Sequence, residues 1–284
     1  ADTHAHIATG HDEAKFGIPR RDLGAAMEVL LGLPELTLVG LSSHIGSQLT
    51  DTGDYVAAAR MLLEAQAACE ASALAAGRAP FELIDFGGGF GVDYGKGCPA
   101  RPADFARAIV KELDRQGRSS LRAIVEPGRS MVAPHGVLVS TVVMQKEAHT
   151  DQALRRWMMI DAGMNDLLRP ALYQALHRIE PLGSPTGPGA RPTRVVGPVC
   201  ESSDDFGTHP MPVELPSHVV IRDAGAYGFT MASEYNGRGL PREVFLRNGR
   251  VFSVISPRGE HAWVRERLAE DDGDFLLGKE PEQG

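Results

Sequence analysis

The chain has 284 residues, which is enough for one large domain or two ordinary ones. Apolar residues make up 43% of the chain and charged residues 23%, as in folded globular proteins, which excludes disordered and fibrous classes. The 29 lysines and arginines against 37 acidic residues give a formal net charge of −8, which disfavours a nucleic-acid-binding or anionic-membrane surface. No apolar stretch reaches membrane-spanning length and no signal peptide is evident, so we expect a cytoplasmic protein with a small-molecule partner.

The three cysteines are Cys69, Cys98 and Cys200, and no two of them have the spacing of a metal-binding or redox pair. An odd set without such spacing argues against a disulfide framework and against a zinc site. We therefore expect no bound metal. A cysteine with a chemical role would act without a second cysteine as its partner.

Short apolar runs alternate with helical patterns in the first half of the chain. Strands are predicted where an apolar run ends in polar or glycine residues, at Thr37–Ser42, Glu82–Phe86 and Arg122–Glu126. Helices are predicted over Asp54–Ala76, before Gly77, and from Pro102 to a stop at Gly117. This alternation of strands and helices implies a parallel sheet.

After Val132 the pattern changes to long strand-like runs with little helical periodicity. These runs are Gly136–Val143, Trp157–Asp161, Thr193–Val199 and Val219–Asp223. A further pair, Glu243–Leu246 and Val251–Ile255, flanks Asn248-Gly249, a sequence that favours a tight hairpin turn. We interpret this half as an antiparallel β domain with a Gly/Pro-rich loop from Pro181 to Pro192 and a frayed acidic tail from Glu270 onward.

Polar and glycine residues follow each predicted strand of the first half. They are Ser43-His44-Ile45-Gly46-Ser47, Gly87-Gly88-Gly89 and Glu126-Pro127-Gly128-Arg129. The carboxyl ends of parallel strands meet at the edge of a sheet where ligands bind. Glycine lets backbone N–H groups approach a phosphate closely, and an arginine adds a planar fork for a carboxylate or phosphate. Each motif alone fits an ordinary turn, but three at one edge predict an anion-binding site.

These motifs, together with Cys200-Glu201-Ser202 and Gly225-Ala226-Tyr227, resemble the pyridoxal-phosphate decarboxylases of the alanine-racemase-like fold. The run from Met231 to Arg238 is similar to the branch of that family that converts meso-diaminopimelate to L-lysine and CO2 in lysine biosynthesis. The resemblance implies an α/β plus all-β architecture. Residues 1–133 would form the C-terminal half of a (β/α)8 TIM-type barrel that binds the cofactor, and residues 134–284 an antiparallel β domain with substrate and dimer contacts.

The resemblance also implies pyridoxal 5'-phosphate as cofactor and assigns residues to it. Glu126 would face the pyridine nitrogen and His44 would stack on the ring face, and both count as catalytic residues. The remaining cofactor contacts implied by the family are Ser47, Gly87, Gly88, Gly89, Gly128, Arg129 and Tyr227. A protonated ring nitrogen, a clamped phosphate and a fixed ring plane are what this chemistry requires.

Diaminopimelate carries an amino-acid group at each end, so its recognition needs charges beyond the cofactor. The family supplies these contacts from Arg129, Arg169, Tyr173, Tyr227 and Glu201, of which Glu201 would read the distal ammonium group. Arg169 and Tyr173 are four residues apart and share a face if that turn is helical. Cys200 resembles the catalytic proton donor to Cα, a role suited to a thiol because its pKa is readily tuned.

The sequence departs from the family at one indispensable position. Its five lysines are Lys15, Lys96, Lys111, Lys146 and Lys279, and none lies in the motif that supplies the Schiff-base lysine. A full barrel needs about 250 residues, far more than precede the predicted β domain. We therefore expect the chain to be the C-terminal portion of a longer enzyme, inactive alone, that works as a homodimer with a shared active site.

Two alternatives stay open from the sequence. One is a sister decarboxylase for another basic amino acid, such as ornithine, arginine or an aminoglycoside-pathway substrate. The other is a non-catalytic homologue that binds partners and has no cofactor-bearing lysine. The intact Cys200-Glu201 pair and Arg129 argue against the second alternative.

Overall fold

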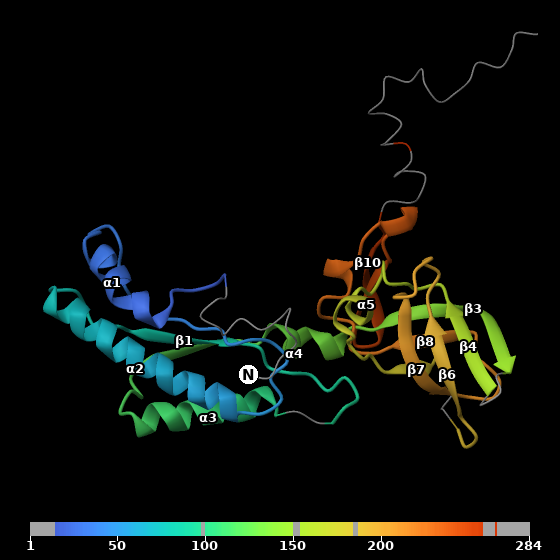
Figure 1. Cartoon of the computed structure of the whole chain (residues 1–284), viewed down its shortest axis with the longest axis horizontal. Helices are drawn as coiled ribbons and strands as arrows, with labels where there is room; N and C mark the ends of the chain where they lie inside the picture. Colours follow the sequence, from blue (N-terminus) through green and yellow to red (C-terminus); the bar gives the residue numbers. More distant parts are fainter. Residues whose placement is uncertain (1–14, 98–99, 150–153, 184–186, 258–264, 266–284) are drawn as a thin grey trace, which may run out of the picture. The chain divides into compact units, whose positions relative to one another are not determined.

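A computed structural model describes residues 15–97, 100–149, 154–183, 187–257 and 265. The chain divides into two compact units, Ala1–Gly136 and Val137–Gly284. Figure 1 colours the first unit from blue to green and the second from green to red. Among the described residues, no helix is both long and apolar enough to cross a membrane.

The first unit contains a parallel β-α-β arrangement. Strand β1 (Leu83–Gly88) pairs in parallel with β2 (Arg122–Glu126), and α3 (Pro102–Arg115) connects them. The other elements are a 3-10 helix (Arg20–Asp22), α1 (Leu23–Leu31), α2 (Gly53–Ala75), α4 (Gly128–Val132) and a second 3-10 helix (Ala133–His135). The two long helices and both strands therefore form where the apolar patterns predict them.

The segment before α2 departs from the prediction of a strand over Thr37–Ser42. It runs beside β1 but contains only an isolated parallel bridge, between Ser42 and Asp85. The reason is the buried amide of Gln66, which accepts from the Leu41 N–H at 2.9 Å and donates to the Leu83 carbonyl at 3.1 Å. The side chain thus replaces the backbone hydrogen bond that a regular ladder would have here.

The core of the first unit lies between the sheet and its helices. An aromatic group in this core consists of Tyr55 from α2, Phe90 from the loop after β1, and Phe105 from α3. The rings of Phe90 and Phe105 are stacked at a centroid distance of 4.6 Å. Ile84, the second residue of β1, has no exposed surface. This packing against the core holds β1 in place.

The second unit contains a six-stranded sheet in the order β5-β8-β3-β4-β6-β7. Its strands are β3 (Leu138–His149), β4 (Leu154–Ile160), β5 (Ile179–Pro181), β6 (Arg191–Val196), β7 (Asp205–Met211) and β8 (His218–Ile221). The sheet is antiparallel, as predicted, at every strand pair except one, because β4 and β6 pair in parallel. The prediction also missed β5, which is too short to show a pattern, and β7, whose polar, glycine and proline residues break any apolar run.

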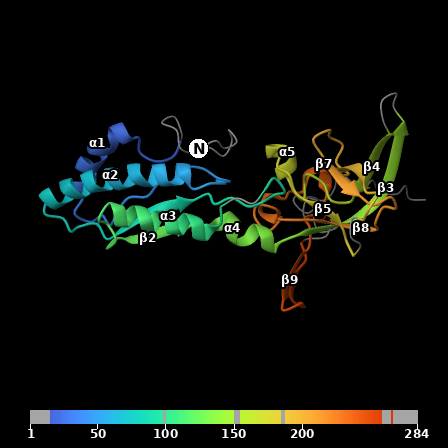
Figure 2. The same ribbon diagram turned by 90° about the horizontal axis from the view of Figure 1, so that it is seen from below.

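Three further features of this unit complete it. The hairpin of β9 (Glu243–Arg247) and β10 (Arg250–Ile255) projects from the rest, as Figure 2 shows. Its turn residues Asn248 and Gly249 have φ of 51° and 74°, as a hairpin turn of this kind requires. A short helix, α5 (Arg169–Tyr173), and 3-10 turns at Phe229–Met231 and Tyr235–Gly237 lie in the connections. The acidic tail from Glu270 falls outside the described residues.

Candidate active site

The first unit brings the predicted cofactor residues together at the carboxyl ends of β1 and β2. Gly88 is the register partner of Glu126, and its backbone N–H donates to Nδ1 of His44 at 3.3 Å. A Cβ added at Gly88 would lie 1.9 Å from the Glu126 carbonyl oxygen, so no larger residue fits. His44 and Glu126 are exposed beside this turn. A carboxylate, an imidazole and a backbone turn free of side chains thus meet at one edge.

The glycine turn itself is held from the protein side by Tyr55. The buried Tyr55 hydroxyl donates to the Gly87 carbonyl at 3.2 Å, and the Gly87 N–H donates to Asp85 at 2.9 Å. Burial, reinforced by the carboxylates of Asp85 and Glu126, raises the pKa of Tyr55, so the hydroxyl stays protonated and can donate. Gly87 has a φ of +65°, a conformation that favours glycine. Sequence reasoning missed Tyr55, because it looks like an ordinary apolar position of α2.

Arg129 lies at the start of α4 and is buried. Its guanidinium donates to Ser47 Oγ at 2.8 Å and to the Tyr94 hydroxyl at 3.0 Å. The structure therefore joins Ser47 and Arg129, two predicted site residues from separate motifs, and adds Tyr94. Apart from its two chain neighbours and the backbone of α4 itself, none of the described residues comes within 4 Å of the position where a Cβ at Gly128 would lie.

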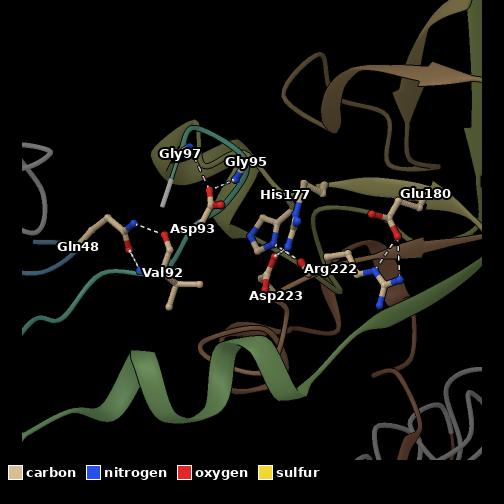
Figure 3. A network of polar contacts seen from close by, with 10 residues as sticks. Gln48, Val92, Asp93, Gly95, Gly97, His177, Glu180, Arg222 and Asp223 are labelled. Carbon is tan, nitrogen blue, oxygen red and sulfur yellow. Dashed lines mark hydrogen bonds and ion pairs between the residues drawn. The ribbon is translucent and has the colours of Figure 1, made fainter. Parts of the chain in front are cut away.

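The loop that follows β1 is stabilised by two polar side chains, shown in Figure 3. Gln48 donates to the Val92 carbonyl at 2.6 Å and accepts from the Val92 N–H at 3.3 Å. Asp93 accepts from the N–H groups of Gly95 and Gly97 at 2.7 and 3.2 Å. These contacts fix the chain on both sides of Tyr94, and so support the Tyr94–Arg129 hydrogen bond.

In the second unit, Cys200 and Glu201 are exposed in the loop between β6 and β7, and Asp204 holds that loop. The buried Asp204 carboxylate accepts from the N–H of Val199 and from the N–H of Met164, each at 2.7 Å. A Cβ at Gly197 would lie 2.3 Å from this carboxylate, which explains the glycine there. Burial raises the pKa of Asp204. The loop that carries Cys200 is thereby fixed to the segment that leads to Arg169.

The Glu201 carboxylate has two partners in its own unit. The Tyr235 hydroxyl donates to one oxygen, and the Ser203 hydroxyl donates to the other at 3.1 Å. The hydrogen bond and charge of Glu201 raise the pKa of Tyr235, which keeps that hydroxyl a donor. Glu201 is thus an exposed carboxylate whose direction is fixed by two hydroxyl groups of its own unit.

Arg169 and Tyr173 lie on α5, so the turn is helical, as a shared face of these two residues requires. Arg169 is buried, and its Nη1 lies 2.8 Å from Nε2 of His177. Tyr227 is 44% exposed and has a φ of +61°. Sequence reasoning missed His177, because nothing in the local pattern connects it with Arg169.

Two domains of one known protein family match the chain. Residues 1–133 match the pyridoxal-dependent decarboxylase pyridoxal-binding domain, and residues 81–235 match the pyridoxal-dependent decarboxylase C-terminal sheet domain. The chain belongs to the pyridoxal-dependent decarboxylase family.

Several curated relatives of this decarboxylase chain carry one name. The chain is 41% identical over 260 residues to the diaminopimelate decarboxylase of Zymomonas mobilis, covering 90% of this chain and 58% of that protein. It is 37% identical over 271 residues to the diaminopimelate decarboxylase of Archaeoglobus fulgidus, covering 93% of this chain and 62% of that protein. The chain therefore spans about three fifths of the length of these relatives.

A solved structure shows the same fold in the family. The diaminopimelate decarboxylase of Helicobacter pylori, complexed with L-lysine, has a TM-score of 0.78 and 36% identity, covering 94% of this chain and 64% of that chain. A lysine/ornithine decarboxylase of Vibrio vulnificus, complexed with putrescine, has a TM-score of 0.63 and 24% identity, covering 78% of this chain and 58% of that chain. The second likeness concerns the fold alone.

Proposed function

We propose that this chain belongs to an enzyme that decarboxylates meso-diaminopimelate to L-lysine and CO2 with pyridoxal 5'-phosphate. The observation that carries the proposal is the cluster of His44, Gly88 and Glu126 at the carboxyl ends of two paired parallel strands. The similarity to diaminopimelate decarboxylases supports the choice of substrate.

The residues of the first unit fit the cofactor. Glu126 provides a carboxylate for the pyridine nitrogen, and His44 provides a flat ring to lie against the cofactor ring. The glycine turn puts no side chain at the carboxyl end of β1, where a phosphate would bind, and its Gly87 and Gly88 N–H groups hold the turn in shape by donating to Asp85 and His44. The proposed contacts are completed in this unit by Ser47, Gly87, Gly89, Gly128 and Arg129, and in the second unit by Tyr227. When bound, the cofactor accepts the electron pair released as CO2 leaves.

The second unit supplies most of the proposed substrate contacts. Its Arg169 and the first unit's Arg129 would bind carboxylates, Tyr173 and Tyr227 would add hydroxyl groups, and Glu201 would bind the distal ammonium. A thiol beside this carboxylate, that of Cys200, would deliver a proton to Cα after CO2 has left. The exposure of both residues of the Cys200–Glu201 pair supports this assignment, because a substrate must reach them.

The architecture and assembly proposed from the family follow the same division. Residues 1–133 would form the C-terminal half of a (β/α)8 barrel, and residues 134–284 the β domain. The enzyme would be a cytoplasmic homodimer in which Cys200 and Glu201 serve the barrel of the other subunit. Sedimentation velocity on the full-length protein would then give the mass of two chains, and a monomer would contradict this assembly.

Steady-state kinetics of Arg169→Ala test the proposed function. In the full-length natural protein, this change should raise KM for diaminopimelate by about ten- to a hundredfold, since a hydrogen bond to a charged group contributes about 1.5 to 3 kcal/mol. The absorbance of the bound cofactor should stay unchanged.

Arg178→Ala is the matched control. Arg178 is half exposed, pairs with Asp223 at 3.2 Å and is not one of the proposed contacts, so KM should remain close to that of the parent. An unchanged KM for Arg169→Ala would assign Arg169 a structural role and would favour a sister decarboxylase that needs no distal carboxylate.

A further inference from the structure

His177 lies between the proposed substrate-binding arginine and the backbone of a neighbouring strand end. Its ring is 2% exposed. Nε2 lies 2.8 Å from Nη1 of Arg169, and Nδ1 lies 2.8 Å from the carbonyl oxygen of Arg222, just beyond β8. Figure 3 shows the His177 ring beside Arg222, whose own guanidinium pairs with Glu180. Both ring nitrogens of His177 therefore have a partner.

These two partners leave one protonation state for the ring. A guanidinium can only donate hydrogen bonds, so Nε2 must accept from Arg169. A carbonyl oxygen can only accept, so Nδ1 must carry a proton and donate to Arg222. The ring is thus neutral, in the Nδ1–H tautomer, and the Arg222 carbonyl selects the form of the ring that Arg169 requires.

The buried position of Arg169 makes this partner important. A buried guanidinium needs its N–H groups satisfied, and α5 is only five residues long, Arg169–Tyr173. Such a short helix gives little rigidity of its own. The acceptor, Nε2 of His177, is held through the Arg222 carbonyl just beyond β8. It therefore fixes the direction of the Arg169 guanidinium independently of the α5 backbone.

We propose that His177 is a positioning residue for substrate recognition, because its Nε2 orients the Arg169 guanidinium toward the substrate carboxylate. This inference rests on the proposed function of Arg169. His177 would thus affect substrate binding although it is buried and is not expected to contact the substrate.

Two substitutions separate the two ends of the ring in the full-length protein. His177→Gln places an amide oxygen near the position of Nε2 and keeps the acceptor for Arg169. His177→Asn places an amide N–H near the position of Nδ1 and keeps the donor to the Arg222 carbonyl. The proposal predicts that His177→Asn raises KM for diaminopimelate by roughly tenfold with a smaller change in kcat, whereas His177→Gln stays within about threefold of the parent. Equal effects, or a larger effect of His177→Gln, would overturn it.

A double variant shows whether His177 acts through Arg169. If it does, His177→Asn combined with Arg169→Ala has the same KM as Arg169→Ala alone. Effects that multiply would mean that His177 acts elsewhere, and the proposal would fall.

A spectroscopic measurement keeps the proposal testable if a variant does not fold. A long-range 1H–15N spectrum of the unmodified protein at neutral pH should show the His177 ring as the Nδ1–H tautomer. An Nε2–H tautomer or a doubly protonated ring would overturn the proposal, whatever the enzyme does. Lysine formation by the parent with no effect of His177→Asn would overturn the inference alone, whereas no lysine formation by the parent would overturn the proposed function.

Discussion

Tyr55 shows how a helix inside the first unit reaches the candidate cofactor site. Its ring packs edge-on against Phe90 and Phe105, with centroid distances of 5.4 and 5.3 Å. Its hydroxyl extends beyond this apolar group to the Gly87 carbonyl. The residue therefore couples the core to the glycine turn.

Tyr55→Phe should weaken cofactor binding more than it weakens the fold. The change keeps the packed ring and removes one neutral hydrogen bond, which contributes about 0.5 to 1.5 kcal/mol. We expect the dissociation constant of pyridoxal phosphate to rise about two- to tenfold, measured by absorbance titration of the full-length apoprotein. The free energy of unfolding should change by no more than about 1.5 kcal/mol. An unchanged dissociation constant would mean that the turn keeps its shape without the hydroxyl.

At the residue scale, the sequence predicts a contact only where both partners belong to a visible motif. His44, Ser47, Glu126 and Arg129 belong to motifs at the ends of predicted strands. The structure joins Ser47 with Arg129, and it places His44 and Glu126 each against Gly88. The supporting residues were not predictable. Asp204 contacts Met164, 40 positions away, and His177 contacts Arg222, 45 positions away, so only the folded chain brings these partners together.

Among the helices and strands of the first unit, glycines and prolines marked where the helices begin and end. Gly77 and Gly117 have φ of +75° and +66°, and each follows the end of a predicted helix. The predicted strand before α2 failed because its regularity depends on Gln66, a side chain from another element. A pattern of apolar residues cannot reveal such an insertion.

The same segment gives a prediction about strand contacts. A Cβ at Gly40 would lie 1.9 Å from the Leu83 carbonyl oxygen, which is backbone and cannot move away cheaply. Gly40→Ala should therefore destabilise the protein by more than about 2 kcal/mol in urea unfolding. Gly24→Ala is the control and should be neutral or slightly stabilising, because in the described part of the chain nothing outside its two chain neighbours and the backbone of α1 itself lies within 4 Å of the added Cβ. Equal stability of the two variants would show that the segment can separate from β1.

Across the whole molecule, the sequence predicted which segments form helices and strands better than it predicted which strands pair with one another. The change from mixed helices and strands to mostly strands agrees with the elements of the two units, Ala1–Gly136 and Val137–Gly284. The parallel pairing of β4 with β6 was not predictable, since strand order depends on contacts between distant segments. The family was predictable because several separate motifs occur in the right order.

Analysis of the reaction products decides whether the protein decarboxylates diaminopimelate, as proposed above. Carboxyl-labelled meso-diaminopimelate is incubated with the full-length natural protein and pyridoxal phosphate, and CO2 and lysine are measured together. We predict equal amounts of CO2 and L-lysine, with ornithine and arginine decarboxylated at least about tenfold less efficiently because they lack the distal carboxylate. No CO2 from diaminopimelate, or a preference for ornithine or arginine, would contradict the account.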